Sequence, residues 1–169
     1  MGITYRSIQK GDVESFWNLM NTLDHQTKYM MYEPGERGKN LSRLENTIDA
    51  AVRGENLLLL ACEGEKLVGY LSAQRSTPRR IRHTAYLVVG ILKEYRGKGI
   101  GTELFRQLDL WAKEKHITRL ELTVMCPNTV AKHLYEKNGF VVEGVKKNSM
   151  ILDGAYVDEY YMAKILEES

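Results

Sequence analysis

The sequence predicts a single α/β domain that contains about seven strands and about four helices. Segments with the hydrophobic periodicity of strands and of helices follow one another in the order β, αα, βββ, α, β, α, ββ. No linker, repeat or low-complexity stretch separates them. A chain of 169 residues is also long enough to bury one hydrophobic core without disulfides or metals. We therefore expect residues 1–169 to form one domain.

The bulk composition narrows the class of protein. With 43% hydrophobic and 27% charged residues, the chain has the composition of a globular protein. No apolar run reaches membrane-spanning length and the first residues lack the apolar stretch of a signal peptide, so we expect a cytoplasmic protein without membrane contact. A net charge of +2 is too small to indicate a nucleic-acid partner. Cys62 and Cys126 lie in apolar strand patterns without metal-ligand spacing, which predicts buried free thiols and no metal.

The first part of the chain predicts a strand and two helices. Residues 3–8 alternate as a strand, and Asp12 opens a helix with one apolar face. Residues 28–40 are irregular and polar. A second helix over about 41–53 ends at Gly54.

Two apolar runs, 57–62 and 67–74, indicate a hairpin closed by Gly64-Glu65-Lys66. The segment 75–82 that follows is a basic turn around Pro78. Its arginines face solvent, approach an anionic ligand or bind an acidic partner, and the sequence leaves these alternatives open.

The most informative segment is residues 85–102. An apolar run, 85–92, predicts a buried strand, and a loop rich in glycine separates it from an apolar-periodic helix. Glycines let backbone N–H groups approach a ligand closely, and the start of a helix adds roughly half a positive charge. The segment therefore predicts a site for an anion, and we expect a phosphorylated cofactor.

The glycine spacing distinguishes three kinds of cofactor loop. A nucleotide-triphosphate loop needs Ser or Thr after Gly-Lys, but Gly99 follows Gly97-Lys98 here. A dinucleotide loop needs its third glycine one residue later than Gly101, although Glu121 lies about 20 residues on, as that fold requires. The third pattern is Arg-x-x-Gly-x-Gly, which Arg96, Gly99 and Gly101 meet.

The downstream residues favour the third pattern. A strand with alternating apolar residues, about 119–126, ends before Asn128, and a short helix follows. Tyr135 lies seven residues after Asn128, two helical turns on, so both side chains can face one side. Gly139-Phe140 then closes the helix. Residues 141–152 and 156–165 complete the chain as two strands joined at Asp153-Gly154.

These motifs, in this order over residues 85–140, resemble the GNAT N-acetyltransferase family. The resemblance implies a mixed, mostly antiparallel sheet flanked by helices, in which the strands at 85–92 and 119–126 splay apart to leave a cleft. It implies acetyl-CoA as donor and a primary amine as acceptor. The pattern Gly154-x-Tyr156-x-Asp158 is similar to the branch with ribosomal-protein N-terminal, polyamine and small amino-compound acetyltransferases, so the acceptor is a small amine, an amino acid or polyamine, or a peptide N-terminus.

The resemblance also implies how the donor binds. Amides from Gly97 to Thr102 hold the pyrophosphate, the backbone near Val89 and Ile91 pairs with the pantetheine arm, and the Val89 amide stabilises the thioester oxygen. Asn128 caps its helix and contacts pantetheine. The residues expected to bind the cofactor are Val89, Gly90, Ile91, Arg96, Gly97, Lys98, Gly99, Ile100, Gly101, Thr102, Asn128 and Tyr135.

Tyr135 is the candidate general acid, because a phenol pKa near 10 lies above the thiol pKa of roughly 8.5. The alternative is an aromatic residue on the core face of its helix. The resemblance does not assign the general base, since Thr123 stands where many relatives place a glutamate. Glu121, on the same strand face, and His83, ahead of the strand at 85–92, are the candidates. Each is as readily explained as a solvated or hydrogen-bonded surface residue.

The acceptor pocket is expected from the loop residues Tyr29, Glu33 and Glu36 and from Asp158 and Tyr160 near the C-terminus. A homodimer is possible, as in relatives. Because Thr123 replaces the usual glutamate, a non-catalytic acyl-CoA-binding sensor is the alternative function.

Overall fold

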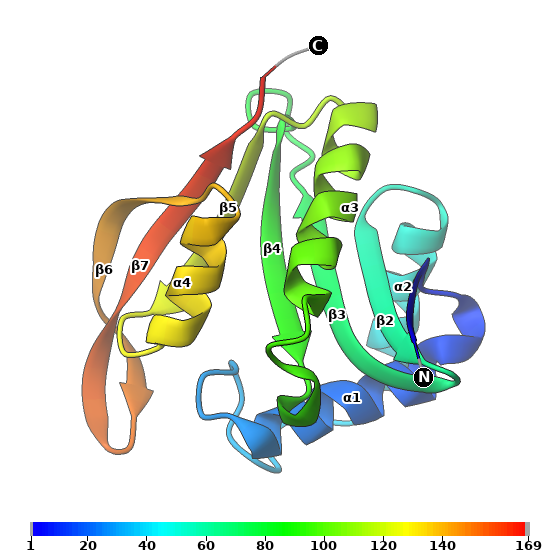
Figure 1. Cartoon of the computed structure of the whole chain (residues 1–169), viewed down its shortest axis with the longest axis horizontal. Helices are drawn as coiled ribbons and strands as arrows, with labels where there is room; N and C mark the ends of the chain where they lie inside the picture. The colour runs from blue at the N-terminus through cyan, green and yellow to red at the C-terminus, as the bar shows by residue number, and fades with distance from the viewer. Residues whose placement is uncertain (1, 168–169) are drawn as a thin grey trace. The chain divides into compact units, whose positions relative to one another are not determined.

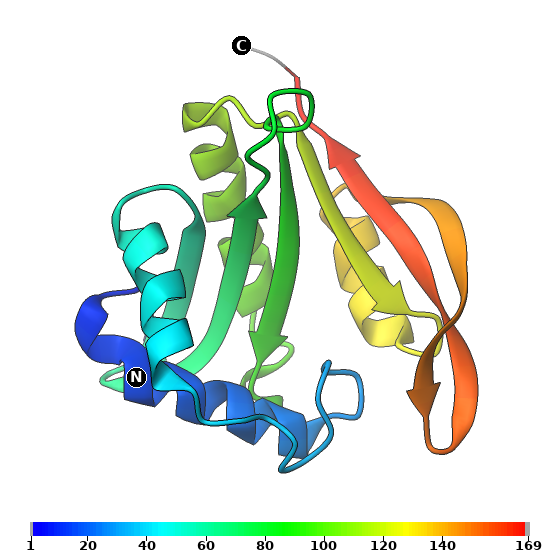
Figure 2. The same cartoon turned by 180° about the vertical axis from the view of Figure 1, so that it is seen from behind.

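The computed structural model describes residues 2–167. The helices and strands are β1 (Ile3–Ser7), α1 (Val13–Gln26), α2 (Leu41–Val52), β2 (Leu57–Glu63), β3 (Lys66–Arg75), β4 (Thr84–Ile91), α3 (Ile100–Glu114), β5 (Arg119–Met125), α4 (Thr129–Lys137), β6 (Val141–Leu152) and β7 (Ala155–Ile165). Single 3-10 turns precede α1 (Lys10–Asp12) and follow β4 (Lys93–Tyr95). The predicted order of strands and helices is confirmed (Figures 1 and 2).

The strands form one seven-stranded sheet in the order β1-β2-β3-β4-β5-β7-β6. β4 and β5 run parallel, whereas β1 with β2, β2 with β3, β5 with β7 and β6 with β7 are antiparallel. The prediction of a mixed, mostly antiparallel sheet is therefore confirmed. The parallel ladder joins the first residues of the two strands, Thr84–Tyr86 with Arg119–Glu121.

The chain divides into two compact units, and β4 and α3 each contribute to both. The first unit comprises the residues up to Gln74 together with Val88–Leu108. In it, α1 and α2 cover one face of β2 and β3, and the start of α3 covers the other (Figures 1 and 2). Leu57 through Cys62 are consequently all buried, since a strand covered on both faces has no polar side.

The second unit comprises Arg75–Leu87 and the residues from Asp109 onward. Leu120, Leu122 and Val124 alternate as the buried residues of β5, as the sequence predicts. α4 covers one face of β5 and β7, whose other face carries no helix of this unit (Figures 1 and 2).

The two cysteines are free, as predicted, but only Cys62 is buried. Cys126 is half-buried, so the prediction of a buried thiol is wrong there. β5 ends one residue earlier, at Met125, and the Cys126 amide instead donates a hydrogen bond to the Asp158 carbonyl at 2.9 Å.

Over residues 2–167, no helix combines the length and apolar character needed to cross a membrane. The single domain over residues 1–169, the cytoplasmic location and the possible homodimer stay predictions.

The polar segment 28–40 is fixed to α1 by a buried ion pair. Arg37 donates from Nε and Nη2 to the two oxygens of Asp24 at 2.7 and 3.0 Å, and Asp24 is only 1% exposed. The Arg37 guanidinium also lies 4.8 Å from the ring centroid of Tyr32. A paired guanidinium and carboxylate can be buried where either alone would be strongly disfavoured, so this pair holds the segment in place.

We expect Asp24→Ala to lower the free energy of unfolding by about 3 kcal/mol, because it leaves the Arg37 guanidinium partly buried without its anion. Glu14→Ala is the control: it breaks the Lys39–Glu14 pair, whose side chains are 50% and 57% exposed, and should change stability by less than about 1 kcal/mol. Urea unfolding of both variants measures the difference. Equal losses would contradict a special role for the Asp24–Arg37 pair.

Candidate active site

The glycine loop lies between β4 and α3. Gly97 and Gly99 adopt φ values of +72° and +82°, a left-handed conformation that a side chain strains. A Cβ built on either residue meets no atom within 4 Å, so the space above the loop is open. Glycine is therefore required at these positions by the backbone conformation; a side chain would not clash with any neighbouring atom.

The amides of this loop are left without partners. The Arg96 amide donates to the Lys93 carbonyl, and the first helical bond of α3 runs from the Glu103 amide to the Gly99 carbonyl. Between them, the amides from Gly97 to Thr102 donate to no acceptor in the described part of the chain. Orphan amides at the positive end of a 15-residue helix form an anion-binding site. A pyrophosphate therefore fits this loop.

Side chains fix the loop at its base. The Tyr95 hydroxyl donates to Glu63 at 2.9 Å, and this hydrogen bond raises the pKa of Tyr95. The Lys98 ammonium lies 5.2 Å from the Tyr95 ring centroid, and the Lys93 amide donates to Gln26 Oε1 at 2.8 Å. Arg96 is exposed and donates from Nε to the Ile91 carbonyl at 3.3 Å. The loop thus has a fixed starting point, backbone amides without acceptors, and the two cationic side chains of Arg96 and Lys98.

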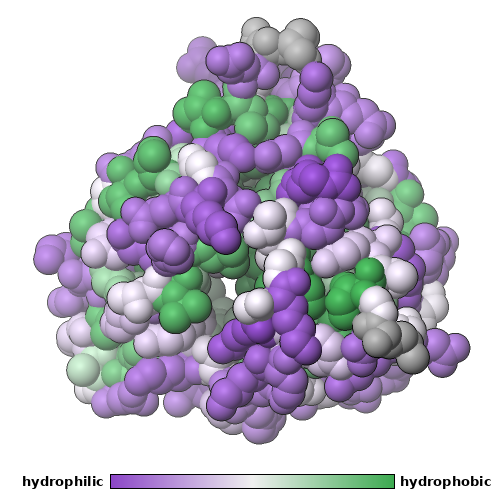
Figure 3. All heavy atoms as spheres, viewed as in Figure 1, coloured by the Kyte–Doolittle hydropathy of each residue, from purple (hydrophilic) through white to green (hydrophobic). Residues whose placement is uncertain are grey.

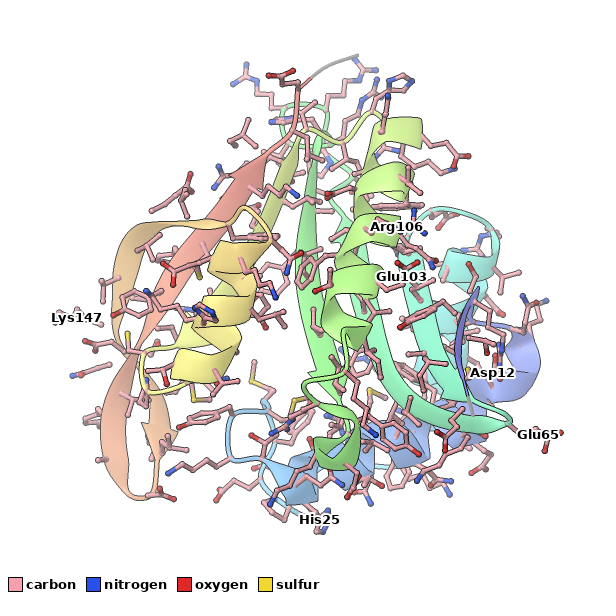
Figure 4. All side chains as sticks on the ribbon, in the orientation of Figure 1. Asp12, His25, Glu65, Glu103, Arg106 and Lys147 are labelled. Atoms are coloured by element: carbon pink, nitrogen blue, oxygen red, sulfur yellow. The ribbon has the colours of Figure 1, made fainter. Side chains whose placement is uncertain are left out.

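Glu103, in the first turn of α3, is an anion that would compete for the helix N-terminus. Arg106 donates to both of its oxygens, at 2.9 and 2.7 Å, and Gln107 donates at 3.0 Å. These hydrogen bonds, that of Arg106 first, lower the pKa of Glu103 to about 2. Figure 4 shows Glu103 and Arg106 side by side on the helix. The sequence analysis missed this pair, although Glu and Arg three residues apart in a helix are a recognisable signal.

The β4 residues proposed to bind the cofactor have different surroundings. Val89 and Ile91 are half-buried, whereas Gly90 is buried. A Cβ on Gly90 would lie 2.7 Å from Leu23 Cδ1 and 2.9 Å from Tyr70 Cε1. Close packing against α1 and β3 therefore requires glycine at this position, whether or not a ligand binds nearby.

α4 positions Asn128 and Tyr135. Asn128 is the N-cap of α4, since its Oδ1 accepts the Ala131 amide at 3.3 Å. Gly139, at φ +95°, ends the helix, and the Phe140 amide donates to the Tyr135 carbonyl at 3.0 Å. Tyr135 is half-buried; burial, with the nearby Tyr86 phenol as the smaller cause, raises the pKa of Tyr135 to about 12.

The residues considered for proton removal lie on two different elements. Tyr86 and Glu121 are opposite one another in the β4–β5 ladder, and the Tyr86 hydroxyl is 2.7 Å from Thr123 Oγ1. Glu121 is 3.4 Å from Arg119 and its side chain is 39% exposed. The exposed His83 precedes β4, and its carbonyl accepts the amides of Thr118 and Arg119. Glu121 thus shares a strand face with Thr123 and Tyr86, whereas His83 lies before the strand.

The residues predicted for the acceptor pocket are mostly engaged in local contacts. In the first unit, the amide of the exposed Glu33 donates to Glu36 Oε1 at 3.2 Å. The Tyr29 ring is half-buried in the same segment.

Asp158 and Tyr160 belong to the second unit. Asp158 accepts from the Asn148 amide at 2.8 Å and from Lys147 at 3.2 Å, and these bonds lower its pKa. The Tyr160 ring lies 5.2 Å from the Lys132 ammonium of α4. Asp158 therefore supports a bulge of β6, and Tyr160 faces the helix.

Comparison with known proteins decides the family. The sequence profile of the Acetyltransferase (GNAT) family matches residues 18–140. The chain belongs to the GNAT acetyltransferase family. It is 32% identical over 111 residues to an L-amino acid N-acetyltransferase of Escherichia coli, covering 63% of this chain and 67% of that protein. It is 28% identical over 157 residues to a spermidine N(1)-acetyltransferase of Vibrio cholerae, covering 92% and 88%.

Solved GNAT structures have the same fold. A GNAT-family acetyltransferase from Streptococcus pneumoniae superposes with a TM-score of 0.92 at 26% identity, covering 98% of this chain and 100% of that one. A Salmonella typhimurium acetyltransferase solved with its cofactor acetyl-CoA gives 0.87 at 19% identity, covering 100% and 96%. As a GNAT N-acetyltransferase, the chain uses acetyl-CoA as donor. Among residues 2–167, no cluster of three or more His, Cys, Asp or Glu could hold a metal ion.

The outward surface of the GNAT chain in Figure 3 is mostly hydrophilic, with scattered apolar patches. Leu110 of α3 and Val130 of α4 are among the exposed apolar side chains, at 58% and 77%. Single exposed apolar residues are ordinary on a protein surface, so these two indicate no additional site.

We expect Gly99→Ala to weaken acetyl-CoA binding at least tenfold, because an alanine leaves φ +82° and turns the neighbouring amides away from the ligand. Gly154→Ala is the matched control: Gly154 has φ +79° and also meets no atom within 4 Å, but it lies in the β6–β7 turn. Titration calorimetry with acetyl-CoA compares the two. The same affinity in both variants would contradict the assignment of the loop.

Proposed function

We propose that this chain transfers the acetyl group of acetyl-CoA to the primary amine of a small amine, an amino acid or polyamine, or a protein N-terminus. The amine attacks the thioester directly. The observation that supports this most strongly is the run of unpartnered amides from Gly97 to Thr102, which suits the donor's diphosphate in a chain of this family. The L-amino acid and spermidine enzymes among its relatives support the range of acceptors.

The donor is held by backbone groups. The amides of Gly97 to Thr102 bind the diphosphate, with Arg96 and Lys98 adding positive charge. The backbone of Val89 and Ile91 pairs with the amides of the pantetheine arm, as an added strand would. When bound, acetyl-CoA supplies an activated acyl carbon as its thioester. The Val89 amide donates to the oxygen on which negative charge develops.

The proton balance requires two groups. The attacking nitrogen forms the new C–N bond and gives up one proton, while the C–S bond breaks and its electron pair stays on sulfur, which takes up one proton. With a pKa of about 12, Tyr135 is protonated throughout the physiological range. Complete transfer of its proton to a thiolate of pKa roughly 8.5 is uphill by about 5 kcal/mol. Tyr135 therefore stabilises the developing thiolate by donating a hydrogen bond, and solvent supplies the final proton.

Glu121 is the better placed acceptor for the amine proton, acting through a water molecule. It lies on the strand face that also carries Thr123 and faces Tyr86 across the ladder. His83, by contrast, precedes the strand and exposes its side chain.

We expect Tyr135→Phe to lower kcat about 100-fold while the Kd for acetyl-CoA stays within twofold, because the hydroxyl acts on the departing sulfur. Tyr156→Phe, at a residue 68% exposed on β7, is the control and should keep wild-type kcat. Thiol release measured over a panel of amines gives the rates. A donor must be protonated, so Tyr135 with a pKa of about 12 should cause no loss of rate below about pH 11. Acetyl-CoA binding without thiol release for every amine would contradict the function itself.

We expect Glu121→Gln to reduce kcat/KM at least tenfold, since the variant cannot accept a proton. His83→Ala should keep the wild-type profile within twofold. The pH dependence of kcat/KM, measured for both with one amine, distinguishes them. The opposite pattern would assign the base to His83, and two unchanged profiles would show that the amine loses its proton to bulk water.

A further inference from the structure

We propose that Lys164 of β7, held in place by Asp109 of α3, is a positioning residue for the reaction. It fixes the C-terminal end of α4 and thereby determines where the Tyr135 hydroxyl lies. The inference rests on the proposed function, in which Tyr135 donates a hydrogen bond to the departing sulfur. Asp109, Lys164 and all of α4 belong to the second unit.

α4 is a short helix that depends on contacts at its two ends. It has nine residues, all of which are described, and none of them is buried. A helix of this length is marginal on its own, because few hydrogen bonds form for the cost of ordering the first turn. The Asn128 cap fixes the start of α4. Contacts at the other end are therefore needed to fix the last turn, which carries Tyr135.

The Lys164 side chain lies against the C-terminal end of α4. A Cβ built on Gly139, whose left-handed conformation ends the helix, would lie 3.1 Å from Lys164 Cε and 3.6 Å from Nζ. Lys164 and Tyr160 are four residues apart on β7, so both side chains are on the face that α4 covers. A cation at this end of a helix is stabilised by the helix dipole and by the last carbonyl groups. The ammonium is thus placed to hold the last turn of α4 against β7.

Asp109 fixes the Lys164 ammonium. Lys164 Nζ donates to Asp109 Oδ2 at 2.8 Å, and the lysine side chain is 20% exposed. Asp109 Oδ1 is buried and has no hydrogen-bond partner in the described part of the chain. A buried oxygen without a partner lowers stability, so this ion pair is not arranged for stability alone. A constraint on the position of the ammonium explains the pair better.

Backbone and ring contacts connect Gly139 to Tyr135. The Tyr135 carbonyl accepts the amides of Asn138 and Phe140, both at 3.0 Å. Phe140 is 2% exposed, and its ring centroid lies 6.2 Å from that of Tyr135. A displacement of Gly139 is therefore transmitted to both the backbone and the ring of Tyr135. Because hydrogen bonds weaken steeply with distance and angle, a small shift of the hydroxyl is enough to slow the reaction.

A double-mutant cycle with Tyr135→Phe tests this coupling. Lys164→Met removes the ammonium and keeps the unbranched chain, and it should lower kcat about tenfold or more while the Kd for acetyl-CoA stays within about twofold. In the Tyr135→Phe background, the same substitution should change kcat by less than about twofold, because the hydroxyl that Lys164 positions is already absent. Thiol release with one amine gives kcat, and calorimetry gives the Kd.

Two further variants accompany the cycle. Lys137→Met is the matched control: Lys137 is also a lysine at the end of α4, but it is exposed and makes no ion pair among the residues that the structure describes, so kcat should stay at the wild-type value. Asp109→Asn keeps the lysine and the shape of its partner. It should lower kcat as Lys164→Met does, and it carries the same cycle if Lys164→Met does not fold.

Hydrogen exchange gives a second readout that needs no acceptor. In Lys164→Met and in Asp109→Asn, the amides of Asn138 and Phe140 should exchange about tenfold faster or more, because the end of α4 opens more often. The Lys132 amide, which donates to the Asn128 carbonyl at the start of the helix, should keep its rate.

An equal fall in kcat in both backgrounds would mean that Lys164 affects only stability, and it would overturn the proposal. Wild-type kcat in both Lys164→Met and Asp109→Asn, or unchanged exchange at Asn138 and Phe140, would also overturn it. The proposed function fails differently: the wild-type protein would then release no thiol with any amine. Wild-type kcat in Tyr135→Phe alone would refute the role proposed for that hydroxyl.

Discussion

The fold must keep the amides between Gly97 and Thr102 free of internal partners while holding both ends of their loop. Gly97 and Gly99 adopt left-handed φ values, and α3 begins directly after them. The hydrogen bond from Tyr95 to Glu63 fixes the start of the loop. In the first turn of α3, Arg106 neutralises the Glu103 carboxylate. The donor site that we propose is therefore a backbone feature, and its side chains serve mainly to hold the loop in place.

Local patterns explain why the sequence predicts so much of this protein. The glycine spacing after Arg96 and the step from Asn128 to Tyr135 depend only on residues close together in the chain, and backbone conformation follows from them. The hydrophobic periodicities likewise predict every strand and helix, with boundaries that shift by one or two residues. The left-handed conformation of the glycine loop was accessible to sequence analysis for the same reason.

The acceptor side depends on register and on distant partners, which the sequence does not display. A shift of one residue exchanges the two faces of a strand; the predicted Tyr160 faces α4, whereas Tyr161 shares the face with Thr123. Asp158 looks like a ligand in the sequence but serves the β6 bulge. The Asp24–Arg37 pair forms only when the segment 28–40 folds back onto α1. Gly90 was predicted from its place beside the cofactor, while packing also demands it.

The backbone amides of the glycine loop neither gain nor lose a proton between mildly acidic and mildly alkaline pH. Binding of the donor's diphosphate by the proposed site should consequently not change with pH in this range, apart from the ionisation of the phosphates themselves. Acid–base control of turnover then falls on the acceptor amine and the groups that surround it. A change of pH should therefore alter the reactivity of the acceptor amine and leave the affinity for the donor unchanged.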